Sequence, residues 1–185
     1  RVVTADILPE NKCIYLDSDT IVMADLTELY CVELSDNLIG GCRDVWIDET
    51  HTEEQRAERA MKTGLDSLDQ YINSGVLLLD LSKIREEGLT QVFLREMKKG
   101  YLHEDQDVIN VCCYNRIWRL EQKWNYFTTF ANDSLKNICP AIIHYATPVI
   151  RPWLTRKCKY NDVWWNFARL WKDTAEFQDV YARMT

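Results

Sequence analysis

The stretch Cys13-Ile14-Tyr15-Leu16-Asp17-Ser18-Asp19 decides how this chain folds and where it would hold a ligand. Its first four residues are apolar, as in a buried strand, and two carboxylates follow one residue apart where that strand ends. Such concentrated negative charge is costly to hold unless a cation neutralises it. Carboxylate oxygens suit Mg²⁺ or Mn²⁺, ions that commonly bridge to substrate phosphates. We therefore predict a metal site; the alternative is an ordinary turn that starts at Asp19-Thr20 and is capped by Asp17.

The composition is that of one globular domain. The 185 residues are enough to bury a substantial core, and we predict a single domain over residues 1–185. A net charge of −7 argues against a nucleic-acid partner. No apolar run approaches the length of a transmembrane helix, and the start has no signal-peptide pattern. Because the chain begins with Arg1 and not Met, we expect a fragment or a processed form.

The seven cysteines indicate free thiols. Their number is odd, and none forms the Cys-x-x-Cys pair of a structural zinc site. Cys13, Cys42 and Cys112 stand in apolar stretches, as small buried hydrophobic residues do in a reducing cytosol. We therefore predict a cytoplasmic protein.

Strand-like and helix-like segments alternate along the chain. The predicted strands are Lys12–Leu16, Leu38–Cys42, Gly75–Leu81, Arg116–Leu120 and Ala141–Tyr145, and the predicted helices are Val2–Leu8, Thr52–Lys62, Leu89–Lys99 and Glu104–Cys113. This alternation predicts an α/β domain with a mostly parallel sheet. Ligands of such sheets bind beyond the carboxyl ends of the strands, where the two aspartates lie.

Three further segments place polar residues next to apolar structure. Asn73-Ser74-Gly75 precedes a buried strand, and its glycine would allow the close approach of a ligand; an ordinary turn is the alternative. In Glu104-Asp105-Gln106-Asp107 the acidic residues suit a helix N-terminus, but Asp105 shares a face with apolar residues and therefore points inward. His144 ends an apolar strand, so it is either a core residue or the third ligand of an Asp-Asp-His site that suits Mn²⁺. Arg151 follows in a loop and could contact phosphate oxygens.

Four ordered motifs resemble those of glycosyltransferase family 8. They are Tyr15-Leu16-Asp17-Ser18-Asp19-Thr20-Ile21-Val22, Asn73-Ser74-Gly75-Val76-Leu77-Leu78-Leu79-Asp80-Leu81, Asp105-Gln106-Asp107-Val108-Ile109-Asn110, and His144-Tyr145 with Arg151-Pro152-Trp153. Members of this family are retaining galactosyl- and glucosyltransferases that use nucleotide sugars, among them bacterial lipopolysaccharide enzymes and glycogenin. The resemblance implies the type A glycosyltransferase fold, a Rossmann-like α/β domain with a mixed sheet.

The resemblance also implies roles for individual residues. Asp17, Asp19 and His144 would bind Mn²⁺ (or Mg²⁺) and, through it, the diphosphate of UDP. Asp105 would hold the sugar hydroxyls and Gln106 would lie under the anomeric carbon, so these two are the predicted catalytic residues. The residues that the resemblance places at the donor are Arg1, Asp17, Ser18, Asn73, Ser74, Gly75, Asp107, Thr147 and Arg151.

The chain departs from the family pattern at two places. The family usually reads His-x-x-Gly-x-x-Lys-Pro-Trp, whereas here Thr147 replaces the glycine, Arg151 replaces the lysine, and one extra residue lies between them. Arginine keeps the positive charge for the departing diphosphate but changes the geometry of its contacts. Family members also begin with a strand and loop that hold the uridine. We therefore expect the type A fold without its first strand and helix.

The predicted function is transfer of a hexose, glucose or galactose, from a UDP-sugar to a hydroxyl acceptor such as a lipopolysaccharide or another cell-surface glycan. No residue has the clear position of a carboxylate nucleophile, which favours front-side departure with retention at the anomeric carbon. One alternative is a non-catalytic module that binds a UDP-sugar or a glycan. The other is a phosphohydrolase of the haloacid dehalogenase type, although Thr20 falls one place too early for that pattern.

The aromatic residues near the C-terminus predict a helix within residues 161–185. Trp164, Phe167, Ala168 and Trp171 follow helical spacing, which favours a stripe that faces the core. Members of the family sometimes place such a tail against a membrane that holds a lipid-linked glycan acceptor. Three basic and four acidic side chains occur from Asn161 onward, so attraction to anionic lipid is not evident. Weak association with the inner face of the membrane is therefore the lesser expectation.

Overall fold

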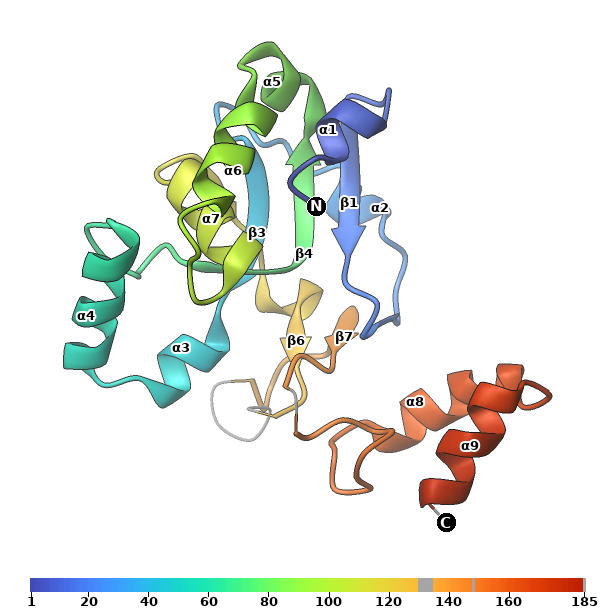
Figure 1. Cartoon of the computed structure of the whole chain (residues 1–185). Helices are drawn as coiled ribbons and strands as arrows, with labels where there is room; N and C mark the ends of the chain where they lie inside the picture. The colour runs from blue at the N-terminus through green and yellow to red at the C-terminus, as the bar shows by residue number, and fades with distance from the viewer. Residues whose placement is uncertain (130–134, 148, 185) are drawn as a thin grey trace.

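Two β-sheets joined by a short turn form the framework of the molecule (Figure 1). The computed structural model describes residues 1–129, 135–147 and 149–184. The strands are β1 (Lys12–Leu16), β2 (Thr20–Val22), β3 (Ile39–Arg43), β4 (Ile72–Asp80), β5 (Ile117–Arg119), β6 (Tyr126–Phe127) and β7 (Ile142–His144). The helices are α1 (Thr4–Ile7), α2 (Thr27–Tyr30), α3 (Val45–Thr50), α4 (Glu53–Thr63), α5 (Leu81–Glu86), α6 (Leu89–Met97), α7 (Glu104–Cys112), η1 (Gln122–Trp124), α8 (Asn161–Ala168), η2 (Arg169–Trp171) and α9 (Ala175–Met184).

Strand β4 is the centre of the larger sheet, whose strand order is β1-β4-β3-β5. Leu77 and Leu79 of β4 face a cluster with residues of α5, α6 and α7. Val76 and Leu78 face the opposite cluster, which contains a residue of α2 and Trp124. Because both faces are covered, β4 is an almost continuous apolar run, as the sequence predicted.

The smaller sheet, of order β2-β7-β6, meets the larger one at the turn Asp17-Ser18-Asp19. The Asp17 N–H donates to the Gly75 carbonyl (2.8 Å), and the Tyr145 N–H donates to the Asp19 carbonyl (2.9 Å). In the antiparallel pair of β2 with β7, Thr20 lies opposite His144. The turn is thus tied to both sheets, and the histidine is brought to the two aspartates.

The predicted α/β class and the mixed sheet are confirmed, but the expectation that parallel pairs predominate is wrong. Among the described strands, β4 is antiparallel to both β1 and β3, and β2 is antiparallel to β7. The parallel pairs there are β3 with β5 and β6 with β7. Alternation along the sequence identifies the elements, but β4 inserts between β1 and β3, and its direction depends on that long-range placement.

Element boundaries follow local capping chemistry. Helix α4 begins with a capping box between Thr52 and Gln55 and ends at Gly64, whose φ of 75° is readily adopted by glycine. The predicted strand Gly75–Leu81 begins earlier, at Ile72, and ends at Asp80 because the Asp80 carboxylate accepts from the Lys83 N–H and caps α5. The sequence did not predict β2, α2, α3, α5 or β6.

The C-terminal helices α8 and α9 lie beside each other, away from the larger sheet (Figure 1). Trp165 is buried, and Trp164 packs against the cluster of Ile143 and Tyr145. Trp171, however, is 69% exposed, so the prediction that the whole stripe faces the core is wrong. The aromatic contacts of α8 are made with α9 and Trp153, which leaves one side of the stripe uncovered within the described residues. No helix in the described part of the chain is both long and apolar enough to cross a bilayer.

Candidate functional site

The turn between β1 and β2 presents two carboxylates to a histidine. One ligand atom from each of Asp17, Asp19 and His144 lies within 4.8 Å of the others. His144 Nε2 is 3.2 Å from Asp19 Oδ1 and 4.0 Å from Asp17 Oδ2. The chain turns at Ser18-Asp19, and the hydroxyl of Thr20, the first residue of β2, donates to the Asp17 carbonyl. The turn therefore lies one residue earlier than the alternative prediction placed it, and it occurs together with the cluster. The sequence prediction that these three residues lie together is confirmed.

The His144 ring is held in one position by its surroundings. The Phe127 ring packs edge-on against it, with centroids 5.3 Å apart. On another side lies Gly75, where an added Cβ would come within 2.2 Å of His144 Cε1 and 2.9 Å of Asp17 Oδ2. A glycine is therefore required because the histidine, rather than a ligand, approaches the backbone of β4.

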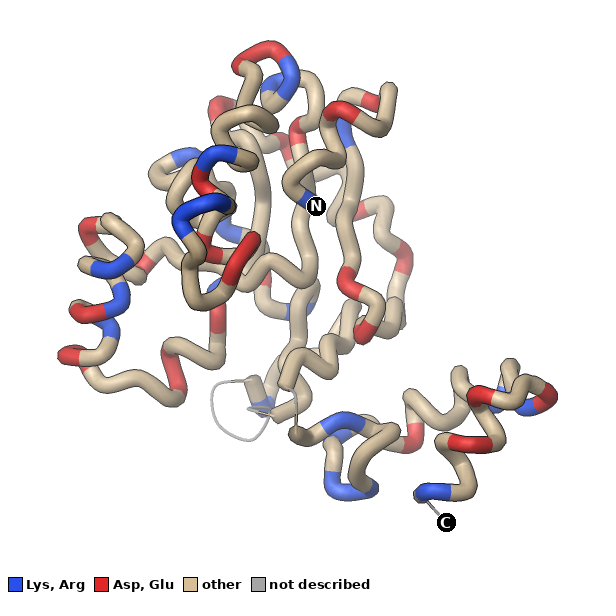
Figure 2. Tube along the Cα trace, viewed as in Figure 1, with Lys and Arg blue, Asp and Glu red and all other residues tan. Residues whose placement is uncertain are grey.

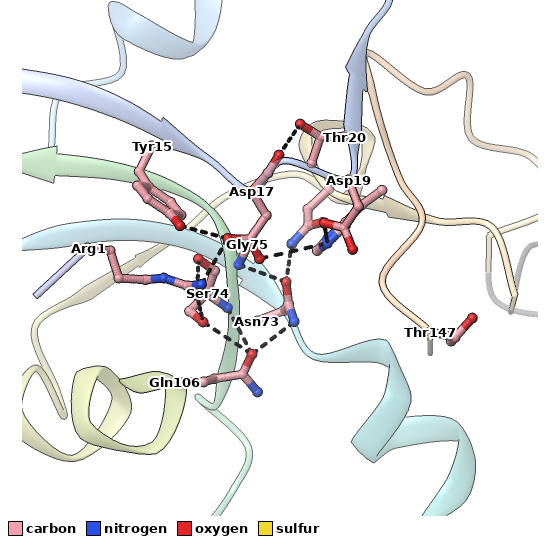
Figure 3. A network of polar contacts seen from close by, with 12 residues as sticks. Arg1, Tyr15, Asp17, Asp19, Thr20, Asn73, Ser74, Gly75, Gln106 and Thr147 are labelled. Carbon is pink, nitrogen blue, oxygen red and sulfur yellow. Dashed lines mark hydrogen bonds and ion pairs between the residues drawn. The ribbon is translucent and has the colours of Figure 1, made fainter. Parts of the chain in front are cut away.

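Arg1 connects three parts of the site (Figure 3). Its Nη2 lies 2.8 Å from Asp17 Oδ1, and its Nε lies 2.7 Å from Asp105 Oδ2. Its Nη1 donates to the carbonyl oxygen (2.9 Å) and the hydroxyl of Ser74. The Tyr15 hydroxyl donates to the same Asp17 oxygen at 2.8 Å. One guanidinium is thus shared by Asp17 and Asp105, and it links the end of β1 with β4 and α7.

Arg151 lies at the other end of the cluster, with Nη2 3.2 Å from Asp19 Oδ2. Burial raises the pKa of Asp19, but the hydrogen bond and the charge of a protonated His144 ring, together with the charge of Arg151, outweigh it, and the pKa lies below its ordinary value. The Arg151 Nε donates to the Thr147 carbonyl at 2.8 Å. Thr147 itself is buried and stands apart from the network in Figure 3, so its observed contact with the cluster runs through Arg151.

A row of amides continues the site from the histidine to α7 (Figure 3). The Asn73 Nδ2 donates to Gln106 Oε1 at 2.9 Å, and the Ser74 N–H donates to the same oxygen at 3.1 Å. The Gln106 Nε2 donates to Asp44 Oδ2 at 2.7 Å. Burial raises the pKa of Asp44 above its ordinary value, although the Gln106 hydrogen bond opposes this.

Two other predicted donor-binding residues, Asp107 and Ser18, lie outside the row of amides. Asp107 is 1% exposed, and its carboxylate accepts from Arg59 Nη2 (2.9 Å), from the Tyr71 hydroxyl (2.5 Å) and from the His103 N–H (2.8 Å). Its contacts hold α4 and the start of α7 together. Ser18 is an exposed residue of the turn.

Sequence reasoning missed Asp44 and Asn125. Asp44 directly follows β3 as Asp17 directly follows β1, so the pattern of a carboxylate after a strand could have identified it. Its side chain also accepts from the Trp46 and Ile47 N–H groups and caps α3. Asn125 is hydrogen-bonded to the His144 ring. It stands between Trp124 and Tyr126 in an aromatic stretch, and no local pattern indicates this contact.

Comparison with known proteins identifies the family. The family model for glycosyl transferase family 8 matches residues 1–157. This chain belongs to glycosyltransferase family 8. The predicted family is therefore confirmed, and the phosphohydrolase alternative is wrong.

Curated relatives and solved structures agree with that family. A Haemophilus influenzae protein named as a glycosyltransferase is 32% identical over 149 residues, which are 75% of this chain and 43% of that protein. The glycosyltransferase GlyF of Streptococcus pneumoniae is 26% identical and matches 95% of this chain and 42% of its own length. This chain thus spans less than half of either relative.

The solved structures establish the fold. The bifunctional glycosyltransferase WbbM superposes with a TM-score of 0.80 at 24% identity, covering all of this chain and 36% of WbbM. The galactosyltransferase LgtC, solved with donor and acceptor sugar analogues, gives a TM-score of 0.70 at 24% identity and covers all of this chain and 66% of LgtC. The predicted type A glycosyltransferase fold is confirmed.

Proposed function

We propose that the chain transfers a hexose, glucose or galactose, from a UDP-sugar to a hydroxyl of a glycan acceptor, with a divalent metal and with retention at the anomeric carbon. The observation that carries this proposal is the cluster of Asp17, Asp19 and His144 within 4.8 Å. Family membership supports a glycosyltransferase that uses a nucleotide sugar.

The donor atoms of the cluster fit a divalent cation. Two carboxylates and one imidazole make a mixed oxygen and nitrogen set, which suits Mn²⁺ better than Mg²⁺. Asp17, Asp19 and His144 would hold the ion. When bound, the metal would neutralise the charge that develops on the leaving diphosphate.

The arginines would contact the charged parts of the donor. Arg151 contacts Oδ2 of Asp19, the carboxylate oxygen that does not face His144. Its guanidinium therefore lies beside the predicted metal ligands, where it would contact a diphosphate oxygen. Arg1 holds Asp17 and Asp105 in place on the opposite side of the site. The exposed Ser18 lies in the turn between the two metal-binding aspartates and would approach the diphosphate.

The amide row would bind the sugar. Asn73, Ser74 and Gln106 share hydrogen bonds along β4 and the start of α7, and Asp105 lies beside them on Arg1. In this proposal Asp105 holds the sugar hydroxyls and Gln106 lies under the anomeric carbon. Asp107 and Thr147 would support the donor site indirectly, Asp107 through the start of α7 and Thr147 through Arg151. Gln106 is an amide and not a carboxylate, which favours front-side departure, with the diphosphate helping to remove the proton of the acceptor hydroxyl.

The test is a donor-hydrolysis panel of UDP-sugars with Mn²⁺. Asp19→Ala should abolish Mn²⁺-dependent release of UDP, because one of the three ligands is lost. Asp36→Ala is the matched control, since Asp36 is an exposed aspartate whose recorded hydrogen bond uses only its backbone carbonyl. Undiminished turnover in Asp19→Ala would refute the metal assignment. Tight binding of UDP with Mn²⁺ but no turnover with any sugar would instead favour the non-catalytic module.

The C-terminal segment supports a membrane-associated acceptor. Residues 152–160 contain three basic and no acidic side chains, whereas residues 161–185 contain three basic and four acidic ones, so the basic excess lies just before α8. Figure 2 shows how the two kinds of charge are distributed along the chain. Exposed Leu170 and Trp171 lie on the same segment. Basic and aromatic side chains together suit weak attachment to an anionic bilayer surface, where a lipid-linked glycan would be reached from the cytoplasmic side.

A further inference from the structure

Asn125 is a buried residue to which the proposed function assigns no role. It follows η1, and its side chain is 0% exposed. Its Oδ1 lies 2.8 Å from His144 Nδ1, and its Nδ2 donates to Asn73 Oδ1 at 2.9 Å. Asn125 therefore joins the predicted metal ligand to the predicted sugar-binding row.

Two backbone N–H groups of β4 fix the direction of the hydrogen bonds along this row. A backbone N–H can only donate, so each atom that receives one must be an acceptor. The Gly75 N–H donates to the Asn73 side chain at 2.9 Å, which identifies that atom as Oδ1. The Ser74 N–H likewise identifies the oxygen of Gln106, and the Asn73 Nδ2 donates to it.

The orientation of Asn125 follows from that of Asn73. Because Asn73 presents an oxygen, Asn125 must present its NH₂ group there, and its own oxygen must face His144. An amide oxygen only accepts, so His144 Nδ1 carries a hydrogen. In the neutral ring the lone pair is then on Nε2, the atom that faces Asp19 and Asp17.

The packing of His144 excludes the flipped ring. A flip would place a ring carbon against Asn125 Oδ1 and would leave that buried oxygen without its donor. Gly75 and Phe127 also lie against the ring and limit its movement. The protonated position of the histidine is therefore set, through Asn125 and Asn73, by the backbone of β4.

We propose that Asn125 is a positioning residue that fixes the Nδ1–H tautomer of His144 and so keeps Nε2 available as a metal ligand. The role of Nε2 as a metal ligand rests on the proposed function, whereas the tautomer of His144 is a property of the metal-free chain. Asn125 also orients Asn73, so it connects the two ends of the donor site.

The first test is the tautomer of the metal-free protein. Long-range ¹H–¹⁵N correlation spectra distinguish the two neutral imidazole forms, and the chain contains only three histidines, His51, His103 and His144. The His144 resonances are assigned by their loss in His144→Gln. We expect the neutral ring of His144 to be the Nδ1–H form. An Nε2–H form in the wild-type protein would overturn the proposal, and this test needs no variant of Asn125.

The second test compares two changes at Asn125. In Asn125→Ala we expect the Nε2–H form to appear and the affinity for Mn²⁺, measured by calorimetry, to fall about 10- to 100-fold, as is usual when the partner of a ligating histidine is removed. Asn125→Asp still accepts from His144 but cannot donate to Asn73. It should therefore keep the tautomer while KM for the UDP-sugar rises.

Asn110→Ala is the matched control. Asn110 is also a buried asparagine with two side-chain hydrogen bonds to β4, at the Ile72 N–H and carbonyl, and it makes no recorded contact with His144. It should lose stability and keep the tautomer. An unchanged tautomer in Asn125→Ala, or the same change in Asn110→Ala, would overturn the proposal. A wild-type protein with the Nδ1–H form but no affinity for Mn²⁺ would support the positioning role and refute the proposed metal function.

Discussion

Gly75→Ala is the smallest change that should disable the site. The new Cβ would lie 2.2 Å from His144 Cε1 and 2.9 Å from both His144 Nδ1 and Asp17 Oδ2. Ordinary van der Waals contact begins at 3.4 Å, so the ring has to retreat by about 1.2 Å if β4 stays in place. Phe127 packs against the ring and Asn125 is hydrogen-bonded to it, so a shift of the ring must disturb both contacts.

Both the stability and the metal affinity should fall in this variant. Overpacking of a well-filled core typically costs about 1–3 kcal/mol of unfolding free energy. A displacement of about 1 Å at a reacting or ligating group commonly costs about 100-fold in function. We therefore expect Gly75→Ala to remain folded, with a lower urea midpoint, and to lose about two orders of magnitude in Mn²⁺-dependent UDP release.

Gly40→Ala separates the two effects. Gly40 lies in the neighbouring strand β3, and its added Cβ would meet the side chains of Leu34 and Leu120 at 3.2 and 3.3 Å. These flexible groups lie in the core and not at the site, so this variant should lose some stability and keep its affinity for Mn²⁺. A folded Gly75→Ala protein that binds Mn²⁺ like the wild type would refute the reasoning from the close approach of His144.

The remaining predictions concern stability. Asp107→Ala leaves the buried Arg59 guanidinium without its carboxylate, and we expect a loss of about 3–5 kcal/mol of unfolding free energy in urea denaturation. For Asp80, burial raises the pKa, but the hydrogen bonds from the Lys83 N–H and the Ser82 hydroxyl prevail, and the pKa lies below the ordinary 3.8. A lowered folded-state pKa means that this stabilisation is complete above the unfolded-state pKa and is lost as the pH falls through the folded-state pKa. Asp80→Asn, which keeps an acceptor for the cap, should therefore flatten the fall in stability below about pH 4 in acid titrations followed by circular dichroism, and an unchanged slope would contradict this assignment.

Local patterns predicted the parts of the site that lie within single segments. The apolar run before Asp17 predicted β1 with its observed bounds. The inward direction predicted for Asp105 agrees with its ion pair to Arg1. These features depend on the period of a strand or a helix, which is readable from neighbouring residues.

Features that depend on pairing between distant segments could not be derived in the same way. The contact of the aspartates with His144 requires β2 to lie opposite β7, more than 120 residues away in sequence, and β2 itself was not predicted. The glycine of Asn73-Ser74-Gly75 was interpreted as making room for a ligand, whereas the structure shows that it makes room for His144. Asn125 has no periodic or motif context, and its role is defined only by the atoms on either side of it.

The charges of the assembled site explain why a cation belongs to the proposed function. Among the residues that the structure describes, Asp17, Asp19 and Asp105 pair with two guanidinium groups, those of Arg1 and Arg151, so with a neutral histidine one negative charge is uncompensated. A diphosphate brought to this site would meet that excess charge and would be repelled. A divalent cation on the two aspartates and His144 would reverse the sign of the net charge, and the site would then attract the diphosphate. The two arginines alone do not suffice for this, because two guanidinium charges do not balance three carboxylates.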